Sequence, residues 1–156
     1  MSIAKQLKDY LDRSGVAYET VGHPRTATAS QSAQAAHVPG DCLAKTVVIH
    51  HEEGAVLAVI PSTHRVDLTT LQELVGRRLG LASETEIQRL FADCDLGAVP
   101  PIGAAYGLPA LIDTALAGRE AIWFEGGDHR TLVKISGADF DRLMKGARQA
   151  AFSHHT

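Results

Sequence analysis

Two apolar runs lie close together in the middle of the chain. Residues 45–50 and 55–60 each have the aliphatic, β-branched composition of a strand, and the polar segment Glu52-Glu53-Gly54 separates them. A connection of this length joins antiparallel neighbours, so the two runs are predicted to form a β-hairpin. We expect the first strand to be central and buried, because its middle, Val47-Val48-Ile49, is apolar throughout.

Helices are predicted on both sides of this strand-rich middle. Ile3, Leu7 and Leu11 recur at helical spacing in a segment predicted as a helix over residues 3–13. Further helices are expected from Ser30 to Ala36, from Asp67, from Ser83 to Phe91 and over 138–148, and further strands over 16–21, 108–113, 121–124 and 131–135. Strands and helices do not alternate regularly. The predicted fold class is therefore α+β, a single domain over residues 1–152 with one mixed, curved β-sheet flanked by helices and a disordered tail over 153–156.

The composition narrows the class of protein. The 156 residues are 45% hydrophobic and 21% charged, as in an ordinary soluble domain, and no segment has the length of a membrane span or the apolar core of a signal peptide. Cys42 and Cys94 are typical of a reduced cytoplasmic protein rather than a disulfide scaffold. A formal net charge of −3 argues against a protein that coats nucleic acid, so we expect neither DNA nor a membrane as a partner.

The segment from Gly97 to Gly103 combines two glycines and two prolines with small apolar side chains. Prolines stiffen the chain, and glycines allow a ligand to approach the backbone closely. Such a segment has two interpretations: a rigid loop that presents backbone groups to a ligand, or a stiff surface turn. Two other segments favour a ligand site, namely the lysine-headed strand over 42–49 and the polar glycine turn over 124–133.

The order of these motifs resembles the YbaK/EbsC family of aminoacyl-tRNA deacylases, which includes the editing insertion of bacterial prolyl-tRNA synthetase. The resemblance runs from about His23 to about Met144. Lys45 matches the lysine of that family, and Gly97 with Pro101 matches its Gly-x-x-x-Pro loop. The early part of the match, in which a histidine is followed by a threonine and an alanine, consists of His23-Pro24, Thr28 and Ala33.

The resemblance implies a site built around Lys45, which would line an editing pocket and contact the ester-linked 3′ end of an aminoacyl-tRNA. From the residues alone, this lysine either extends to the surface or faces a cleft. The expected catalytic residues are Lys45, Gly97, Pro101 and His129, and the expected substrate-binding residues are His23, Thr28, Thr46, Ile102, Gly103, Asp113, Gly126 and Gly127. His23 and His129 are equally compatible with structural hydrogen bonding, and Asp113 with a turn at a strand end.

Other chemistries have little support in the sequence. His50 and His51 are adjacent on a predicted strand and point to opposite faces, and no pair of histidines or cysteines has metal-ligand spacing, so we expect no metal. No serine elbow and no phosphate-binding glycine loop is present, so we expect neither a covalent intermediate nor a cofactor. An aminoacyl ester is already activated, and a positioned water with a stabilised oxyanion suffices to cleave it.

The predicted function is therefore trans-editing, the metal-independent hydrolysis of a mischarged small amino acid from tRNA. Size exclusion in the pocket would provide specificity, as in a double sieve. The expected partners are the aminoacyl-tRNA 3′ end and an aminoacyl-tRNA synthetase. Two alternatives stay open: a non-catalytic module that binds the tRNA end or docks on a synthetase, and a hydrolase for another acylated small molecule.

Overall fold

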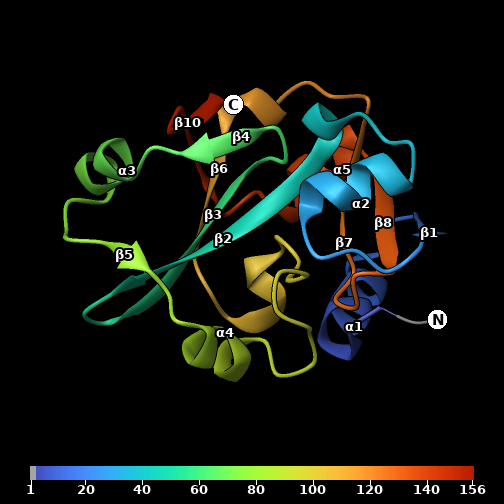
Figure 1. Cartoon of the computed structure of the whole chain (residues 1–156), viewed down its shortest axis with the longest axis horizontal. Coiled ribbons are helices and arrows are strands. Elements are labelled where there is room, and N and C mark those ends of the chain that lie inside the picture. Colours follow the sequence, from blue (N-terminus) through green and yellow to red (C-terminus); the bar gives the residue numbers. More distant parts are fainter. Residues whose placement is uncertain (1–2) are drawn as a thin grey trace.

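The protein is built on one mixed β-sheet, as the computed structural model, which describes residues 3–156, shows (Figure 1). The strand order is β1-β8-β7-β2-β3-β6-β9, and β5 pairs with β2 beside this path. Three neighbouring pairs are parallel, β2 with β7, β3 with β6 and β6 with β9, and the others are antiparallel. The strands are β1 (Tyr18–Gly22), β2 (Leu43–His51), β3 (Gly54–Pro61), β5 (Gly80–Leu81), β6 (Ala110–Asp113), β7 (Ala121–Glu125), β8 (Thr131–Ser136) and β9 (Arg148–Ala150).

The predicted hairpin forms the centre of this sheet. β2 and β3 pair without interruption from Ala44 opposite Pro61 to His51 opposite Gly54. Side chains alternate between the two faces of the hairpin; those of β3 are buried on both faces from Ala55 to Pro61, whereas β2 is half-buried at Lys45, Thr46 and Val47. The expectation that these strands are central is confirmed.

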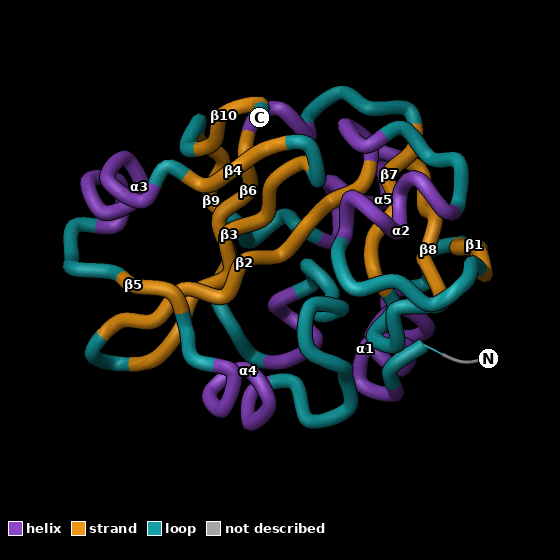
Figure 2. Tube along the Cα trace, in the orientation of Figure 1, coloured by secondary structure: helices purple, strands orange, loops and turns teal. Residues whose placement is uncertain are grey.

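Different helices cover the two faces of the sheet (Figure 2). On one face, α1 (Lys5–Ser14), α4 (Glu84–Leu90) and α5 (Gly137–Leu143) pack on a large apolar cluster that includes Val48 of β2 and Leu57 of β3. On the other face, α3 (Leu68–Val75) packs near Ile49 and Ile60, and α2 (Ala29–Ala35) packs near Leu43. The predicted α+β fold with a mixed sheet flanked by helices is confirmed.

Side-chain caps begin four of the helices, namely α2, α3, α4 and α5, the last through Ser136. The Asp67 and Ser83 side chains accept hydrogen bonds from the backbone N–H groups of Thr70 and Glu86, and these predicted helix starts are confirmed. For α2 the predicted start is wrong, because the cap is Thr28, whose Oγ1 accepts from the Gln31 N–H, and not Ser30.

The last part of the chain differs from the expectation. The closing helix ends at Leu143 instead of 148, and β9 pairs with β6, because the chain turns back to the sheet edge. Residues 153–156 are not a disordered tail, because β10 (Ser153–His155) pairs with β4 (His64–Val66) in a second, two-stranded sheet. Phe152, which is 1% exposed, anchors this strand in the core. Met1 and Ser2, the start of the expected domain, lie outside the described residues.

Candidate functional site

Lys45 lies on β2 at the point where the neighbouring strand β7 ends. β2 pairs with β7 only at Leu43 and Ala44, and further along the same edge it pairs with β5 at Ile49 and His50. Among the described strands, this edge of β2 is therefore unpaired from Lys45 until β5 begins to pair with it. In Figure 1 the loop that contains Gly97 lies beside this stretch of β2.

The ammonium group of Lys45 is held inside the structure. The side chain is half-buried, and Nζ donates a 2.8 Å hydrogen bond to the backbone oxygen of His64 on β4. Burial, with a smaller contribution from the neighbouring Arg65 charge, lowers the pKa of Lys45 from its ordinary value. An ammonium carries three donors, and this contact uses one, so the group can still bind an acceptor.

Gly97 lies where three segments meet. Its φ of +80° is a conformation that side chains other than glycine rarely adopt. A Cβ at this position would lie 3.1 Å from Cε1 of His129 and 3.3 Å from the backbone oxygen of Ala27. The residue itself is exposed, so its backbone is accessible from solvent while its α-carbon is closely flanked.

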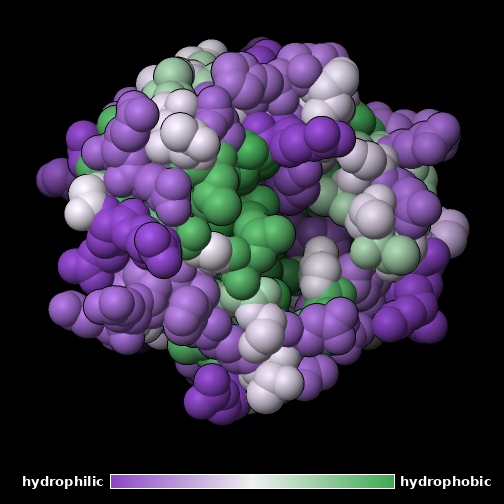
Figure 3. Space-filling view, turned by 60° about the vertical axis from the view of Figure 1, so that its left-hand side comes forward, coloured by the Kyte–Doolittle hydropathy of each residue, from purple (hydrophilic) through white to green (hydrophobic). Residues whose placement is uncertain are grey.

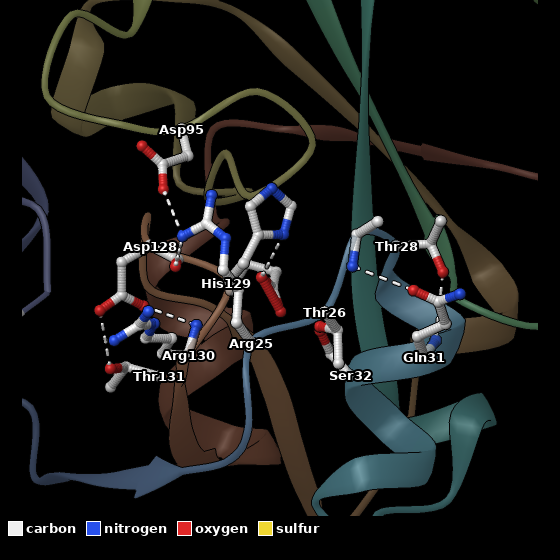
Figure 4. Close-up of polar contacts among 12 residues, drawn as sticks. Arg25, Thr26, Thr28, Gln31, Ser32, Asp95, Asp128, His129, Arg130 and Thr131 are labelled. Carbon is white, nitrogen blue, oxygen red and sulfur yellow. Dashed lines mark hydrogen bonds and ion pairs between the residues drawn. The ribbon is translucent and has the colours of Figure 1, made fainter.

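His129 holds the turn that precedes Gly97. The residue is 4% exposed, has a φ of +60°, and makes a short hydrogen bond through Nε2 to the Leu96 backbone oxygen. Asp128 shapes this histidine's turn by accepting hydrogen bonds from the Arg130 N–H and the Thr131 hydroxyl. Arg25 spans the same region, because Nη1 lies 3.4 Å from both Asp95 Oδ2 and the Asp128 backbone oxygen (Figure 4).

The structure adds two residues that the sequence analysis missed. Glu125 at the end of β7 is 3% exposed, and its Oε2 lies 3.9 Å from Nδ1 of His129. Burial raises the pKa of this carboxyl group to about 7, the nearby Ser32 hydroxyl lowers it in part, and the Asp128 charge raises it. Ser32 is fully buried on α2, with Oγ 2.6 Å from the Thr26 hydroxyl. An acidic residue at the end of the apolar run Ala121–Phe124 was the one available signal.

Two expected substrate-binding residues lie in the segment that leads into α2. Thr28 is the cap of that helix, as described above. His23 donates its backbone N–H to the Arg130 oxygen at 2.8 Å, and its Nδ1 lies 2.7 Å from the Pro24 oxygen. These contacts place the 23–28 segment beside the turn that carries His129.

Thr46 follows Lys45 on the opposite face of β2. Its Oγ1 is buried and, within residues 3–156, has no hydrogen-bond partner. The same holds, over that range, for Nε2 of His23.

The glycine–proline loop has an exposed start and a buried end. Pro101, Ile102 and Gly103 are buried, and a Cβ on Gly103 would lie 2.4 Å from the Leu108 backbone oxygen. The end of the loop therefore packs closely against its own continuation. Of this loop, Gly97 is the residue whose described contacts reach His129.

Gly126 and Gly127 also have structural contacts. The Gly126 oxygen accepts from the Ala4 N–H at 2.8 Å, and the Gly127 oxygen accepts from the Asp95 N–H at 2.7 Å. A Cβ on Gly126 would lie 2.7 Å from Cγ2 of Ile3. The two glycines thus dock the start of the chain and the segment before Gly97 against the β7–β8 turn.

The contacts of Asp113 match the turn-forming interpretation. Oδ1 accepts from the Ala115 N–H at 2.8 Å, and Oδ2 accepts from the Phe152 N–H at 2.9 Å and the Ser153 hydroxyl at 2.8 Å. All three donors belong to the segment after β6 or to the C-terminal strand. Its expected role in substrate binding stays a prediction.

The described residues, 3–156, offer little to metal or thiol chemistry. No group of three or more His, Cys, Asp and Glu side chains in that range is arranged to hold a metal ion. Burial raises the pKa of the Cys94 thiol to about 12, which disfavours the thiolate that a nucleophile requires. In the same range, no helix combines the length and apolar character needed to cross a bilayer.

Comparison with known proteins decides the family. The model of a family described as the aminoacyl-tRNA editing domain matches residues 23–143, which is most of the chain. The chain belongs to the aminoacyl-tRNA editing domain family. This editing domain is 25% identical over 142 residues to the prolyl-tRNA editing protein ProX of Acetoanaerobium sticklandii, a match that covers 86% of each chain.

Solved structures share the fold of the editing domain over nearly its whole length. A candidate trans-editing enzyme for prolyl-tRNA synthetase superposes with a TM-score of 0.84 at 30% identity and covers 96% of each chain. A scaffold used for epitope grafting superposes with a TM-score of 0.85 at 31% identity and covers 97% of each chain. The predicted family resemblance is confirmed.

Proposed function

We propose that this protein is a trans-editing deacylase that hydrolyses the ester between a mischarged small amino acid and the terminal ribose of a tRNA. The family match and the similarity to a prolyl-tRNA editing protein support the reaction class. The observation that carries the proposal is the convergence of Gly97, His129 and the Ala27 backbone next to the end of β7, beside which Lys45 lies.

We assign Lys45 to binding the negative charge that develops on the substrate. Its ammonium retains two donors after the His64 contact, and a half-buried cation interacts more strongly with an anion than an exposed one does. In the reaction, a water attacks the ester carbonyl and negative charge develops on the carbonyl oxygen. A preorganised donor at that oxygen is the main contribution that such a site makes to the rate.

We assign Gly97 to letting the substrate ester approach the backbone closely. With no side chain, this exposed residue leaves its backbone open, and a larger residue would meet His129 and Ala27 at little more than 3 Å. Close approach to the backbone at such a position is compatible with a small acyl group. Figure 3 shows a face of the molecule that is hollowed at its centre, with hydrophobic residues along one wall and a hydrophilic rim.

His129 is assigned to holding the loop rather than to proton transfer. Its Nε2 is occupied by Leu96, and its Nδ1 is buried and faces Glu125. A general base must reach the attacking water directly or through one water. We therefore infer that a basic group of the substrate takes the proton of the attacking water and the ribose oxygen leaves with a proton, while the Lys45 ammonium stabilises the oxyanion, without a metal or covalent intermediate.

We also propose that the protein acts in the cytoplasm on free aminoacyl-tRNA, with or without a bound synthetase. The decisive experiment incubates the protein with tRNAs mischarged with alanine, serine, threonine, cysteine or proline and follows release of the amino acid. We expect the wild-type protein to cleave one or more of these esters, and to do so equally fast in the presence of EDTA. We expect Lys45→Ala not to cleave them. Tight binding of a mischarged tRNA without turnover would instead identify a binding module, and loss of activity in EDTA that zinc restores would contradict the metal-free reaction.

A further inference from the structure

Glu125 and His129 form a buried pair of ionisable side chains behind the Leu96–Gly97 turn. The two side chains are 4% and 6% exposed, and Oε2 of the acid lies 3.9 Å from Nδ1 of the imidazole. Both carboxyl oxygens and Nδ1 are buried; in the described part of the chain Nδ1 has no hydrogen-bond partner, and the Ser32 hydroxyl acts on the carboxyl and favours its ionised form. At 3.9 Å the carboxyl and the imidazole face one another beyond hydrogen-bond distance, and burial makes an ionised carboxyl costly beside an Nδ1 lone pair.

The other nitrogen of the ring fixes the position of the imidazole proton. Nε2 of His129 contacts the Leu96 backbone oxygen, and a carbonyl oxygen can only accept. Nε2 must therefore carry a proton. In a neutral imidazole this leaves Nδ1 as an acceptor, and the group that faces it is the carboxyl of Glu125.

We propose that Glu125 is a positioning residue of the editing site, whose protonated carboxyl group faces Nδ1 of His129 and thereby keeps the imidazole proton on Nε2, which donates to Leu96. Its effect on the rate rests on the proposed deacylase function, whereas its effect on the imidazole does not. The carboxyl of Glu125 faces the His129 imidazole, and the imidazole contacts the Leu96 oxygen. Protonation of Glu125 at the end of β7 therefore affects the turn that carries Gly97.

The Glu125–His129 pair holds the Leu96–Gly97 turn only when it carries two protons. With two protons, as a carboxylic acid beside neutral imidazole or as a carboxylate beside imidazolium, both Nδ1 and Leu96 are satisfied. With one proton left, a proton on Nε2 leaves a buried carboxylate against a lone pair. A proton on Nδ1 instead turns the Nε2 lone pair toward the Leu96 oxygen. Loss of one proton therefore weakens the hold on the turn in either tautomer.

The surroundings contribute few competing charges. α2 contributes the Ser32 hydroxyl, and its segment Ala29–Ala35 contains no charged residue. Asp128 in the same turn disfavours the ionised acid, and Arg25, which precedes α2, is paired with Asp95 at 3.4 Å. Other ionisable groups on adjoining segments include His23, Lys45, Cys94, Lys134 and the exposed Arg130. Burial raises the pKa of Glu125 to about 7, so the pair loses one of its two protons in the neutral pH range.

The first test reads the imidazole directly and does not depend on activity. Nitrogen-15 NMR of the His129 ring distinguishes a proton on Nδ1 from one on Nε2. We expect wild type to hold the Nε2 proton at pH 6 and to change tautomer or exchange as the pH passes about 7. Glu125→Gln, whose amide donates to Nδ1 without ionising, should hold the Nε2 proton up to pH 8.5, and the exposed matched control Glu19→Gln should behave as wild type. A ring state that is independent of both pH and Glu125 would overturn the proposal.

The second test measures single-turnover deacylation between pH 6 and 8.5, after subtraction of spontaneous ester hydrolysis. Glu125→Leu removes the donor, and at pH 6.5 its rate should fall about five- to tenfold, the equivalent of one lost hydrogen bond. Wild type should lose rate above pH 7, whereas Glu125→Gln should not. Equal pH profiles for wild type and Glu125→Gln would contradict a positioning role even if the protein is a deacylase. If no tRNA is deacylated, the proposed function fails and the NMR result still decides the role of Glu125.

Discussion

Lys45 on β2 donates its Nζ to the backbone oxygen of His64 on β4, 19 residues away, at 2.8 Å. β4 is held in turn by the C-terminal strand β10, and Ser153 of that strand lies 2.8 Å from Nδ1 of His64. The end of the chain thus supports the segment that orients the lysine. Because β4 is held by β10, we expect that the charge of Lys45 can be removed with little loss of stability.

Lys45→Ala should lower single-turnover deacylation by about a hundredfold or more, the effect of losing one donor at a developing oxyanion. The melting temperature should change by only a few degrees, because the side chain is half-buried and makes one described hydrogen bond. Lys134→Ala is the matched control, since it removes a lysine from another strand, where Nζ lies 5.3 Å from the Trp123 ring centroid. Full activity of Lys45→Ala would remove the central assignment.

Gly97→Ala should combine backbone strain with a blocked approach to the site. Its φ of +80° costs an alanine about 1–2 kcal/mol, and the new Cβ meets His129 at 3.1 Å. Gly76→Ala has nearly the same φ, +79°, but its Cβ meets nothing within 4 Å. We expect similar losses of stability in urea, and a loss of deacylation of about tenfold or more for Gly97→Ala alone. Equal activity in the two variants would mean that the loop is only a stiff turn.

Glu125 should make the free energy of unfolding fall as the pH rises. Its pKa is raised in the folded protein from 4.5 to about 7, so the folded state keeps a proton that the unfolded chain releases between these values. The stabilisation is complete below pH 4.5, declines up to about pH 7 and is then gone. Since a tenfold change in an acid constant corresponds to ~1.4 kcal/mol, the total decline is on the order of 3 kcal/mol.

Urea denaturation of wild type and Glu125→Gln at pH 5 and pH 8 measures this effect. The variant cannot ionise, so its advantage over wild type should grow by on the order of 3 kcal/mol between the two pH values. Glu19→Gln replaces an exposed acid on β1 and should show no such growth. A constant difference between Glu125→Gln and wild type would show that the acid is ionised in the folded protein throughout.

Asp113→Asn should loosen the C-terminal strand. An amide turns one donor toward the Phe152 N–H or the Ser153 hydroxyl, both of which now donate to Oδ2. We expect a loss of about 1–3 kcal/mol of stability and faster hydrogen exchange at the Phe152 amide. The exposed Asp141→Asn is the control. Unchanged exchange together with weaker substrate binding would instead support the role of Asp113 expected from the family resemblance.

The sequence alone determined the elements whose signals are local. The β2–β3 hairpin follows from two apolar runs around a short polar turn, and the starts of α3 and α4 follow from the caps Asp67 and Ser83. The order of motifs around Lys45 and Gly97 was enough to predict the family. For the hairpin and the helix starts, the residues that decide the structure are within a few positions of one another.

Contacts between distant segments decided the rest. The closing helix ends early and β10 forms because the chain finds partners on β6 and β4, and neither pairing leaves a local signal. Glu125 and His129 lie four residues apart in one turn, but the remote Leu96 oxygen is what the other nitrogen of the imidazole contacts. Burial by segments remote in sequence raises the pKa of Glu125, and the tertiary structure alone can decide such burial because desolvation depends on what surrounds a group in space.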